Sequence, residues 1–256
     1  MSPEVKALAE RLGQARRITV FSGAGISTES GIPDFRGPNG VWKTVDPREF
    51  EIDRFLSSPQ ARQRYWLRST EMYQAILKAR PNPAHHAVTR LHLMGRLNAV
   101  LTQNVDGLHQ RAETPAERVV ELHGSTLHVS CLSCGARMPR EAFQHRVSDS
   151  GEAPACDACG GLMKPATISF GQMLDPQSLE RAADAVNACD LFLVVGSSLV
   201  VYPAAGLPLQ AAQRGVPVVI LNHEPTPHDD YAALVLHGTA GPVLSAAVDA
   251  LEARMS

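Results

Sequence analysis

The chain has 256 residues, 44% of them hydrophobic, and its 24 basic and 26 acidic residues leave a formal net charge of −2. A chain of this length buries a substantial core, either as one large domain with an insertion or as two domains. The charge balance provides no basic field for a phosphate backbone, which argues against nucleic acid as the main partner. We therefore expect a small cofactor or a peptide as ligand.

The N-terminal segment, residues 1–17, has apolar residues at helical spacing and no apolar core of signal-peptide length. No stretch of the sequence approaches the roughly 20 apolar residues of a membrane span. We expect a soluble, cytoplasmic monomer without a membrane partner. In a reducing compartment, spaced cysteines bind metal more often than they form disulfides.

Apolar, β-branched runs recur along the chain and predict buried parallel strands, which lie at 18–22, 98–103, 118–122, 190–198, 216–222 and 232–238. Helical patterns lie between several of these runs, at 83–95, 175–188 and 203–215, and Gly206 and Pro208 blur the start of the last. This alternation predicts an α/β fold with a doubly wound parallel sheet.

Two stretches interrupt the alternation. Residues 44–82 predict a mostly helical insertion, and residues 124–165 contain four cysteines among short strand-like pieces. The second stretch is too small to hold a hydrophobic core of its own, so a metal ion is expected to stabilise it.

The four cysteines form two pairs with the spacing of zinc-ribbon knuckles: Cys131 and Cys134, then Cys156 and Cys159. Two disulfides or four unrelated thiols are the alternative. Four thiolates fill a tetrahedral zinc site and leave no position for water, so we expect one structural Zn²⁺ without a catalytic role. Cys189, alone before a predicted strand, is expected in the core.

Polar residues cluster after several predicted strands, where an open parallel sheet binds its ligands. These clusters are "GAGIST" (23–28), "TQNVDGLH" (102–109), "ELHGS" (121–125), "VGSSLVVYP" (195–203) and "LNHEP" (221–225). Each has a structural alternative as well: a tight glycine turn, an Asn or Asp helix cap, a structural histidine or a Ser-Gly turn. Their common position at one edge of the sheet favours a binding site.

Together these motifs, with "GIPDFRG" (31–37) and the two cysteine pairs, occur in the order and nearly the spacing of the sirtuins, the NAD-dependent protein deacylases. The resemblance extends from about residue 18 to residue 241. It implies a Rossmann-like NAD-binding domain from residues 1–43, 83–123 and 166–256. A smaller domain would combine the helical insertion, 44–82, with the zinc-binding module, 124–165.

The resemblance also implies the roles of individual residues. His123 would be the general base, and Asn104 and Asp106 would join it in catalysis; an imidazole titrating near neutral pH suits a general base. NAD would be a co-substrate, cleaved to nicotinamide and O-acyl-ADP-ribose without hydride transfer. The residues expected at NAD are Gly23, Ala24, Gly25, Ile26, Thr28, Asp34, Phe35, Arg36, Gln103, Asn104, Asp106, Gly196, Ser197, Ser198, Asn222, Glu224 and Ala240.

The acyl-lysine peptide is expected to contact Tyr65, Arg68, Ile168, Phe170, Gly171, Leu199, Val200 and Val201. Ser169 and Gln172 depart from the first of two consecutive phenylalanines and from the acidic residue found in many sirtuins, which leaves the preferred acyl group and peptide open. The segment around "RQRYWLRS" looks closest to class II sirtuins. Tyr65 and Arg68 also match the Tyr-x-x-Arg pattern that grips an acyl carboxylate in desuccinylating sirtuins, although they equally fit an amphipathic helix face packing on the zinc module.

Three functions remain compatible with these residues. The first is an NAD-dependent lysine deacylase. The second is a mono-ADP-ribosyltransferase that shares the NAD cleavage step, and the third is a non-catalytic NAD or ADP-ribose binding module. The presence of His123, Asn104 and Asp106 argues against the third, because a binding module has no use for a base beside the ribose.

Overall fold

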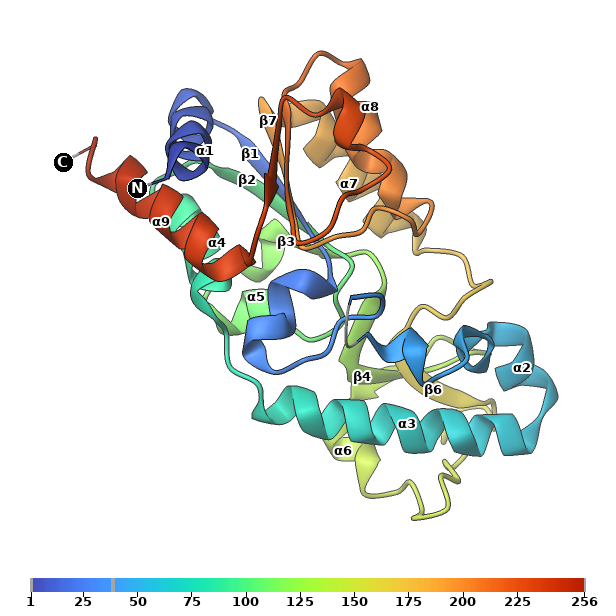
Figure 1. The fold of residues 1–256 in the computed structure, drawn as a ribbon. Helices are drawn as coiled ribbons and strands as arrows, with labels where there is room; N and C mark the ends of the chain where they lie inside the picture. The colour runs from blue at the N-terminus through green and yellow to red at the C-terminus, as the bar shows by residue number, and fades with distance from the viewer. Residues whose placement is uncertain (1, 38–39, 256) are drawn as a thin grey trace.

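The computed structural model describes residues 2–37 and 40–255. Residues 1, 38, 39 and 256, which fall within the predicted NAD-binding domain, lie outside the described residues. Figure 1 shows a parallel sheet with helices on both sides, and beside it a smaller lobe that contains α2, α3, β4, β6 and α6.

The larger sheet has six strands in the order β3-β2-β1-β7-β8-β9, and every neighbouring pair is parallel. The strands are β1 (Ile18–Ser22), β2 (Leu97–Thr102), β3 (Val119–Glu121), β7 (Leu191–Val195), β8 (Val218–Asn222) and β9 (Leu234–His237). This is the order of a doubly wound dinucleotide-binding sheet, whose ligand crevice opens where the order reverses, between β1 and β7. The predicted fold class is confirmed.

Helices cover both faces of this sheet. Successive side chains of each strand point to opposite faces, and the two sets are buried in two separate cores. Ile18 and Val20 pack with α1 (Pro3–Gln14), α4 (Pro83–Leu93) and α9 (Ala240–Glu252). On the other face, Phe21 packs with α7 (Pro176–Ala188) and α8 (Leu207–Gln213), and Cys189 lies in this core as expected. The predicted helix at 203–215 consists of a short 3₁₀ helix, η5 (Ala204–Gly206), followed directly by α8. Within the described ranges, no helix is long and apolar enough to cross a membrane.

The smaller lobe joins the helical insertion to the cysteine-bearing segment through one core. Its second sheet is antiparallel, in the order β5-β4-β6, with β4 (Gly124–Cys131), β5 (Arg137–Pro139) and β6 (Met163–Thr167). Its helical parts are η3 (Pro47–Phe50), α2 (Ile52–Ser57), α3 (Pro59–Lys78) and α6 (Arg140–Gln144), and η2 (Val41–Lys43) precedes them in the chain. Trp66 of α3 stacks on Phe143 of α6 with ring centroids 5.6 Å apart. The insertion therefore supplies apolar surface that the cysteine segment lacks.

Candidate active site

The loops that follow β1 and β7 are in backbone contact at the point where the strand order reverses. The amide of Gly23 donates to the Val195 carbonyl at 3.1 Å, and that of Gly25 donates to Gly196 at 2.8 Å. A Cβ on Gly25 would lie 2.8 Å from the Gly196 Cα, and Gly196 itself has φ +65°. The glycines are thus required by the packing of the two loops, a reason that the sequence does not reveal.

The short helix η1 (Ala24–Ser30) begins within this contact, because it includes Gly25. Ile26 is fully buried, so it anchors the loop in the core. Thr28 is exposed, and its hydroxyl donates to the Gly25 carbonyl at 3.0 Å.

Asp106, Asn104 and Ser27 form a buried polar cluster beneath the loop. The Ser27 hydroxyl donates to Asp106 Oδ2 at 2.7 Å and accepts from Asn104 Nδ2 at 3.1 Å. Burial raises the pKa of Asp106, while hydrogen bonds from the Leu108 amide and from Ser27 oppose that rise. The Leu108 amide donates to Asp106 Oδ1 at 2.9 Å just before α5 (Leu108–Arg111), whose N-cap residue is Gly107.

Asn104 and Gln103 connect β2 to both glycine loops. Asn104 Nδ2 donates to the Gly23 carbonyl at 3.1 Å. Gln103 Nε2 donates to the Ser197 hydroxyl at 2.7 Å, and this hydroxyl also accepts the Leu199 amide at 3.3 Å. Side chains from three strand ends are therefore brought together as predicted.

His123 lies next to the polar cluster of Gln103 and Asn104, and its contacts define the tautomer of the ring. Its Nδ1 is 3.1 Å from the Gln103 carbonyl, which can only accept, so Nδ1 carries the proton and Nε2 of the neutral ring is a free base. Burial lowers the pKa of His123, partly offset by that hydrogen bond. The imidazole is consequently neutral at pH 7 and able to accept a proton.

The predicted acyl-binding segment is attached directly to His123. The Ile168 amide donates to the His123 carbonyl at 2.8 Å, and the Phe170 amide donates to Phe50 at 3.0 Å. Phe170 is 38% exposed, and its ring centroid lies 6.0 Å from that of Trp42. Trp42 in turn stacks on Phe35 with ring centroids 5.0 Å apart, and Phe35 belongs to residues 23–37, the segment after β1 that we call the NAD loop. Trp42, which sequence reasoning missed, therefore connects the two expected binding regions.

Tyr65 and Arg68 of α3 have different environments. Tyr65 is 6% exposed and packs in the core of the smaller lobe, as the amphipathic-face interpretation expects. Its hydroxyl nonetheless lies 3.2 Å from Thr167 Oγ1 and 3.5 Å from Ser169 Oγ, at the end of β6. Arg68 is half-buried and has no hydrogen-bond or ion-pair partner among residues 2–37 and 40–255. Its charge is available to a ligand.

The NAD loop contains a second cation of this kind. The Asp34 carboxylate accepts the Gly37 amide at 3.0 Å and so shapes the turn. Burial lowers the pKa of Arg36, whose guanidinium makes no hydrogen bond or ion pair within the described part of the chain. A phosphate would suit it.

The remaining predicted residues occupy neighbouring loops. Asn222 donates to the Glu224 carbonyl at 2.7 Å, and Ala240 is buried at the start of α9. Glu29 of η1, missed by sequence reasoning, accepts the Gly241 amide at 2.7 Å and ties this helix start to the NAD loop. The other residues line the loops without a further contact that assigns them a role: Ala24, Ser198, Gly171, Val200 and Val201.

The four predicted zinc ligands converge. Their sulfur atoms all lie within 4.8 Å of one another, with 3.5 Å between Cys131 and Cys159 and 3.8 Å between Cys134 and Cys156. Zn–S bonds of about 2.3 Å in a tetrahedron place sulfurs roughly 3.8 Å apart. Backbone amides of Ser133 and Gly161 also donate to two of the sulfurs, which favours thiolates. The donor set fits one zinc ion.

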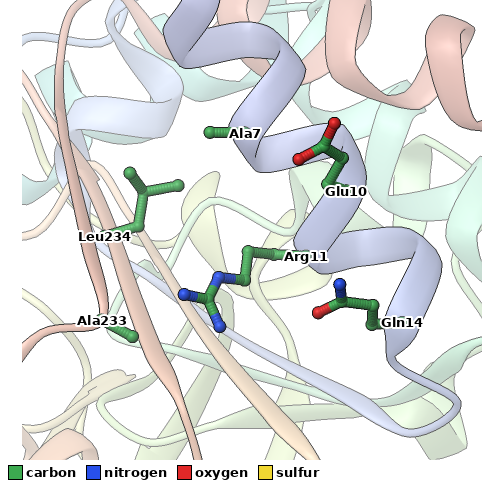
Figure 2. Close-up of a pocket in the computed structure, with 6 residues that line it drawn as sticks. All are labelled: Ala7, Glu10, Arg11, Gln14, Ala233 and Leu234. Atoms are coloured by element: carbon green, nitrogen blue, oxygen red, sulfur yellow. The ribbon is translucent and has the colours of Figure 1, made fainter.

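A hollow of about 330 Å³ lies at the amino end of the sheet's strands, away from the polar loops described above (Figure 2). It is lined by Ala7, Glu10, Arg11, Gln14, Ala233 and Leu234, from α1 and from the amino end of β9. None of the predicted site residues lies there, and the ligand-binding edge of a parallel sheet is the carboxyl one.

Comparison with known proteins identifies the family. The model of the Sir2 family matches residues 23–203. The chain belongs to the Sir2 family. Among Sir2 relatives, the NAD-dependent protein deacetylase 1 of Bradyrhizobium diazoefficiens is 44% identical over 240 residues, which cover 94% of this chain and 93% of the relative. The NAD-dependent protein deacylase 2 of Archaeoglobus fulgidus is 43% identical over 251 residues, 97% of this chain and 96% of the relative.

Solved Sir2 structures agree in fold. A structure described under the mechanism and regulation of Sir2 enzymes superposes with a TM-score of 0.89 at 43% identity and covers both chains completely. A Sir2 variant in complex with a deacetylated p53 peptide and 3′-O-acetyl ADP ribose has a TM-score of 0.88 at 37% identity and covers 96% of this chain and 98% of that one.

Proposed function

We propose that this Sir2-family protein is an NAD-dependent protein-lysine deacylase that releases nicotinamide and O-acyl-ADP-ribose. The observation that carries the proposal is the basic Nε2 of His123, held by the Gln103 carbonyl between the polar cluster and the acyl-binding segment. The names of the relatives, protein deacetylase and deacylase, support the same activity.

NAD would lie across the loops that follow β1 and β7, where it would supply the ribose carbon to which the acyl oxygen bonds as the bond to nicotinamide breaks. Asn104, Gln103 and Asp106 would hold the ribose and nicotinamide, because their side chains are fixed by the contacts described above. Arg36 would meet the phosphates with a charge that no described residue neutralises. Asn222 and Glu224 would hold the adenosine half.

His123 would then accept the proton of a ribose hydroxyl at Nε2. Its proton at Nδ1 is retained by the Gln103 carbonyl, so the ring presents one acceptor in one orientation. The lowered pKa keeps this acceptor unprotonated at neutral pH.

One Zn²⁺ on the four cysteines would stabilise the smaller domain, formed from residues 44–82 and 124–165, without a part in the reaction. NAD would bind the domain formed from residues 1–43, 83–123 and 166–256. The acyl-lysine peptide would enter between them, next to Phe170 and the exposed Val200.

We further propose that the acyl-binding segment, next to Tyr65 and Arg68 of α3, accepts an acyl chain that ends in a carboxylate. Arg68 offers a guanidinium that pairs with none of the described residues, and the Tyr65 hydroxyl lies at the end of β6. Arg68→Met should abolish desuccinylation and spare deacetylation. Arg64→Met, one turn earlier on α3 and paired with Glu49, is the matched control and should change neither. Equal loss of both activities in Arg68→Met would refute this specificity.

The activity itself is tested with NAD and a panel of acetyl-, propionyl-, succinyl- and lipoyl-lysine peptides, with nicotinamide followed by mass spectrometry. At least one peptide should raise nicotinamide release, and His123→Ala should abolish the increase. If no acyl peptide raises release above the level of His123→Ala, the deacylase proposal fails.

A further inference from the structure

A buried lysine lies on the strand that leads into the acyl-binding segment, and no step proposed above uses it. Lys164 of β6 is 1% exposed. Its ammonium donates to the Pro165 carbonyl at 3.2 Å and to the Thr167 carbonyl, and it forms no ion pair with a carboxylate of residues 2–37 and 40–255. A buried charge is costly unless an opposite charge or hydrogen bonds compensate it. Here hydrogen bonds to two carbonyls are the compensation that the described residues supply.

The ammonium of Lys164 lies against Tyr65 of α3. Its Nζ is 5.4 Å from the centroid of the Tyr65 ring. The Tyr65 hydroxyl lies 3.2 Å from Thr167 Oγ1 and 3.5 Å from Ser169 Oγ. Three hydroxyl groups therefore lie together at the end of β6, and one of them belongs to a ring that the ammonium contacts.

The charges around Tyr65 favour an anion. Burial alone would raise the pKa of Tyr65, but the Lys164 ammonium and the hydrogen bonds of the hydroxyl together lower it. A more acidic phenol is a stronger hydrogen-bond donor to a carboxylate. Arg68, three residues further along α3, shares a helix face with Tyr65 and has no carboxylate partner in the described part of the chain. Tyr65 thus has one cation on β6 and a second on its own helix.

The backbone connects these hydroxyls to the candidate general base. Ile168 lies between Thr167 and Ser169, and its amide donates to the His123 carbonyl at 2.8 Å. The Ser169 amide donates to Gln172 Oε1 at 3.2 Å, which fixes the turn that follows. The position of the hydroxyl groups relative to His123 is therefore set by the same short segment that is expected to contact the acyl-lysine.

We propose that Lys164 determines acyl specificity: its charge, acting through the Tyr65 hydroxyl, favours an acyl-lysine whose chain ends in a carboxylate over one with a neutral chain. Lys164 is a positioning residue, because it acts on the ligand through Tyr65 and through the backbone of residues 165–167. The inference deepens the proposed function and rests on it for the class of substrate. A purely structural role at β6 would instead affect charged and neutral acyl chains alike.

Binding of peptides to the full chain without NAD tests the inference independently of catalysis. Isothermal titration compares a succinyl-lysine and an acetyl-lysine peptide of one sequence. Lys164→Met removes the charge and keeps the length of the side chain, so it should lower the ratio of succinyl to acetyl affinity about tenfold. Lys164→Arg keeps the charge and should lower this ratio less than about threefold. Lys78→Met, at the exposed end of α3, is the control for net charge and should leave the ratio unchanged.

Tyr65→Phe provides a second test, which also serves if Lys164→Met does not fold. It removes the hydroxyl through which the charge acts, so it should lower the same ratio. A succinyl peptide that does not bind the wild type, an equal loss of both affinities in Lys164→Met, or an unchanged ratio in Tyr65→Phe would overturn the role of Lys164.

The failure of this inference is distinguishable from that of the proposed function. If the affinity ratios follow these expectations but no acyl peptide causes nicotinamide release from NAD, the deacylase proposal fails and the role of Lys164 stands. Nicotinamide release with an unchanged affinity ratio in Lys164→Met would give the reverse result.

Discussion

Replacing His109 by glutamine should make the stability of the protein less sensitive to acid. In the folded protein, burial lowers the pKa of His85 to about 2 and that of His109 to about 4, whereas both titrate near 6.5 in the unfolded chain. Below pH 6.5 the unfolded state therefore binds more protons than the folded state. The contribution of these two histidines to the free energy of unfolding is complete above pH 6.5, and it is lost as the pH falls towards their pKa values in the folded protein.

The size of this effect follows from the shifts. At pH 5, about 1.5 units below the unfolded pKa, each histidine costs about 2 kcal/mol relative to pH 8, which gives about 4 kcal/mol for the pair. His109→Gln removes one titrating group and should lose about 2 kcal/mol less than wild type between these two pH values.

Urea unfolding of both proteins at the two pH values measures the difference, because all other titrating groups are common to them. The same loss of unfolding free energy in wild type and in His109→Gln would refute the reasoning.

Three further predictions concern other parts of the structure. Chelation of zinc should unfold the smaller lobe and abolish activity, and full activity in a verified metal-free protein would contradict this. Gly196→Ala should lower the free energy of unfolding by more than about 3 kcal/mol, because a Cβ at this position would overlap the backbone of Gly25 and Ile26. Gly215→Ala is the control: this glycine also has a positive φ, +78°, but faces open space, so the substitution should cost only about 1–2 kcal/mol. Equal losses of unfolding free energy in thermal unfolding would refute the packing argument. The acid limb of kcat/KM should lie below pH 6.5, because burial lowers the pKa of His123; a limb above that pH would exclude His123 as the base.

Much of the fold was accessible from local patterns. Buried strands such as β1 and β7 appear as continuous apolar runs, because parallel strands covered on both faces need no polar side. The convergence of the cysteines followed from spacing alone. The positions of polar residues after strands likewise indicated the edge at which Gln103, Ser197 and Gly23 meet, because parallel strands end together.

The contacts that join distant segments were not accessible in this way. The requirement for Gly25 and Gly196 arises from two loops that lie far apart in the sequence. Trp42 is an ordinary aromatic residue until the fold places it between Phe35 and Phe170. The hydrogen bond from the Ser22 hydroxyl to Thr102 Oγ1 could not be predicted, because a serine or threonine at the end of a buried apolar run is also explained by the strand preference of such residues. The placing among class II sirtuins stays a prediction.

The fate of the acyl group tests the proposed activity most directly. A peptide whose lysine carries an isotope-labelled acyl carbon is incubated with the protein and NAD, and the labelled products are identified by mass spectrometry. We predict that the label appears as O-acyl-ADP-ribose in a 1:1 ratio with nicotinamide, and that His123→Ala forms none. Label that appears as the free acid without NAD, or that stays on the peptide while ADP-ribose becomes attached to protein, would contradict an NAD-dependent deacylase.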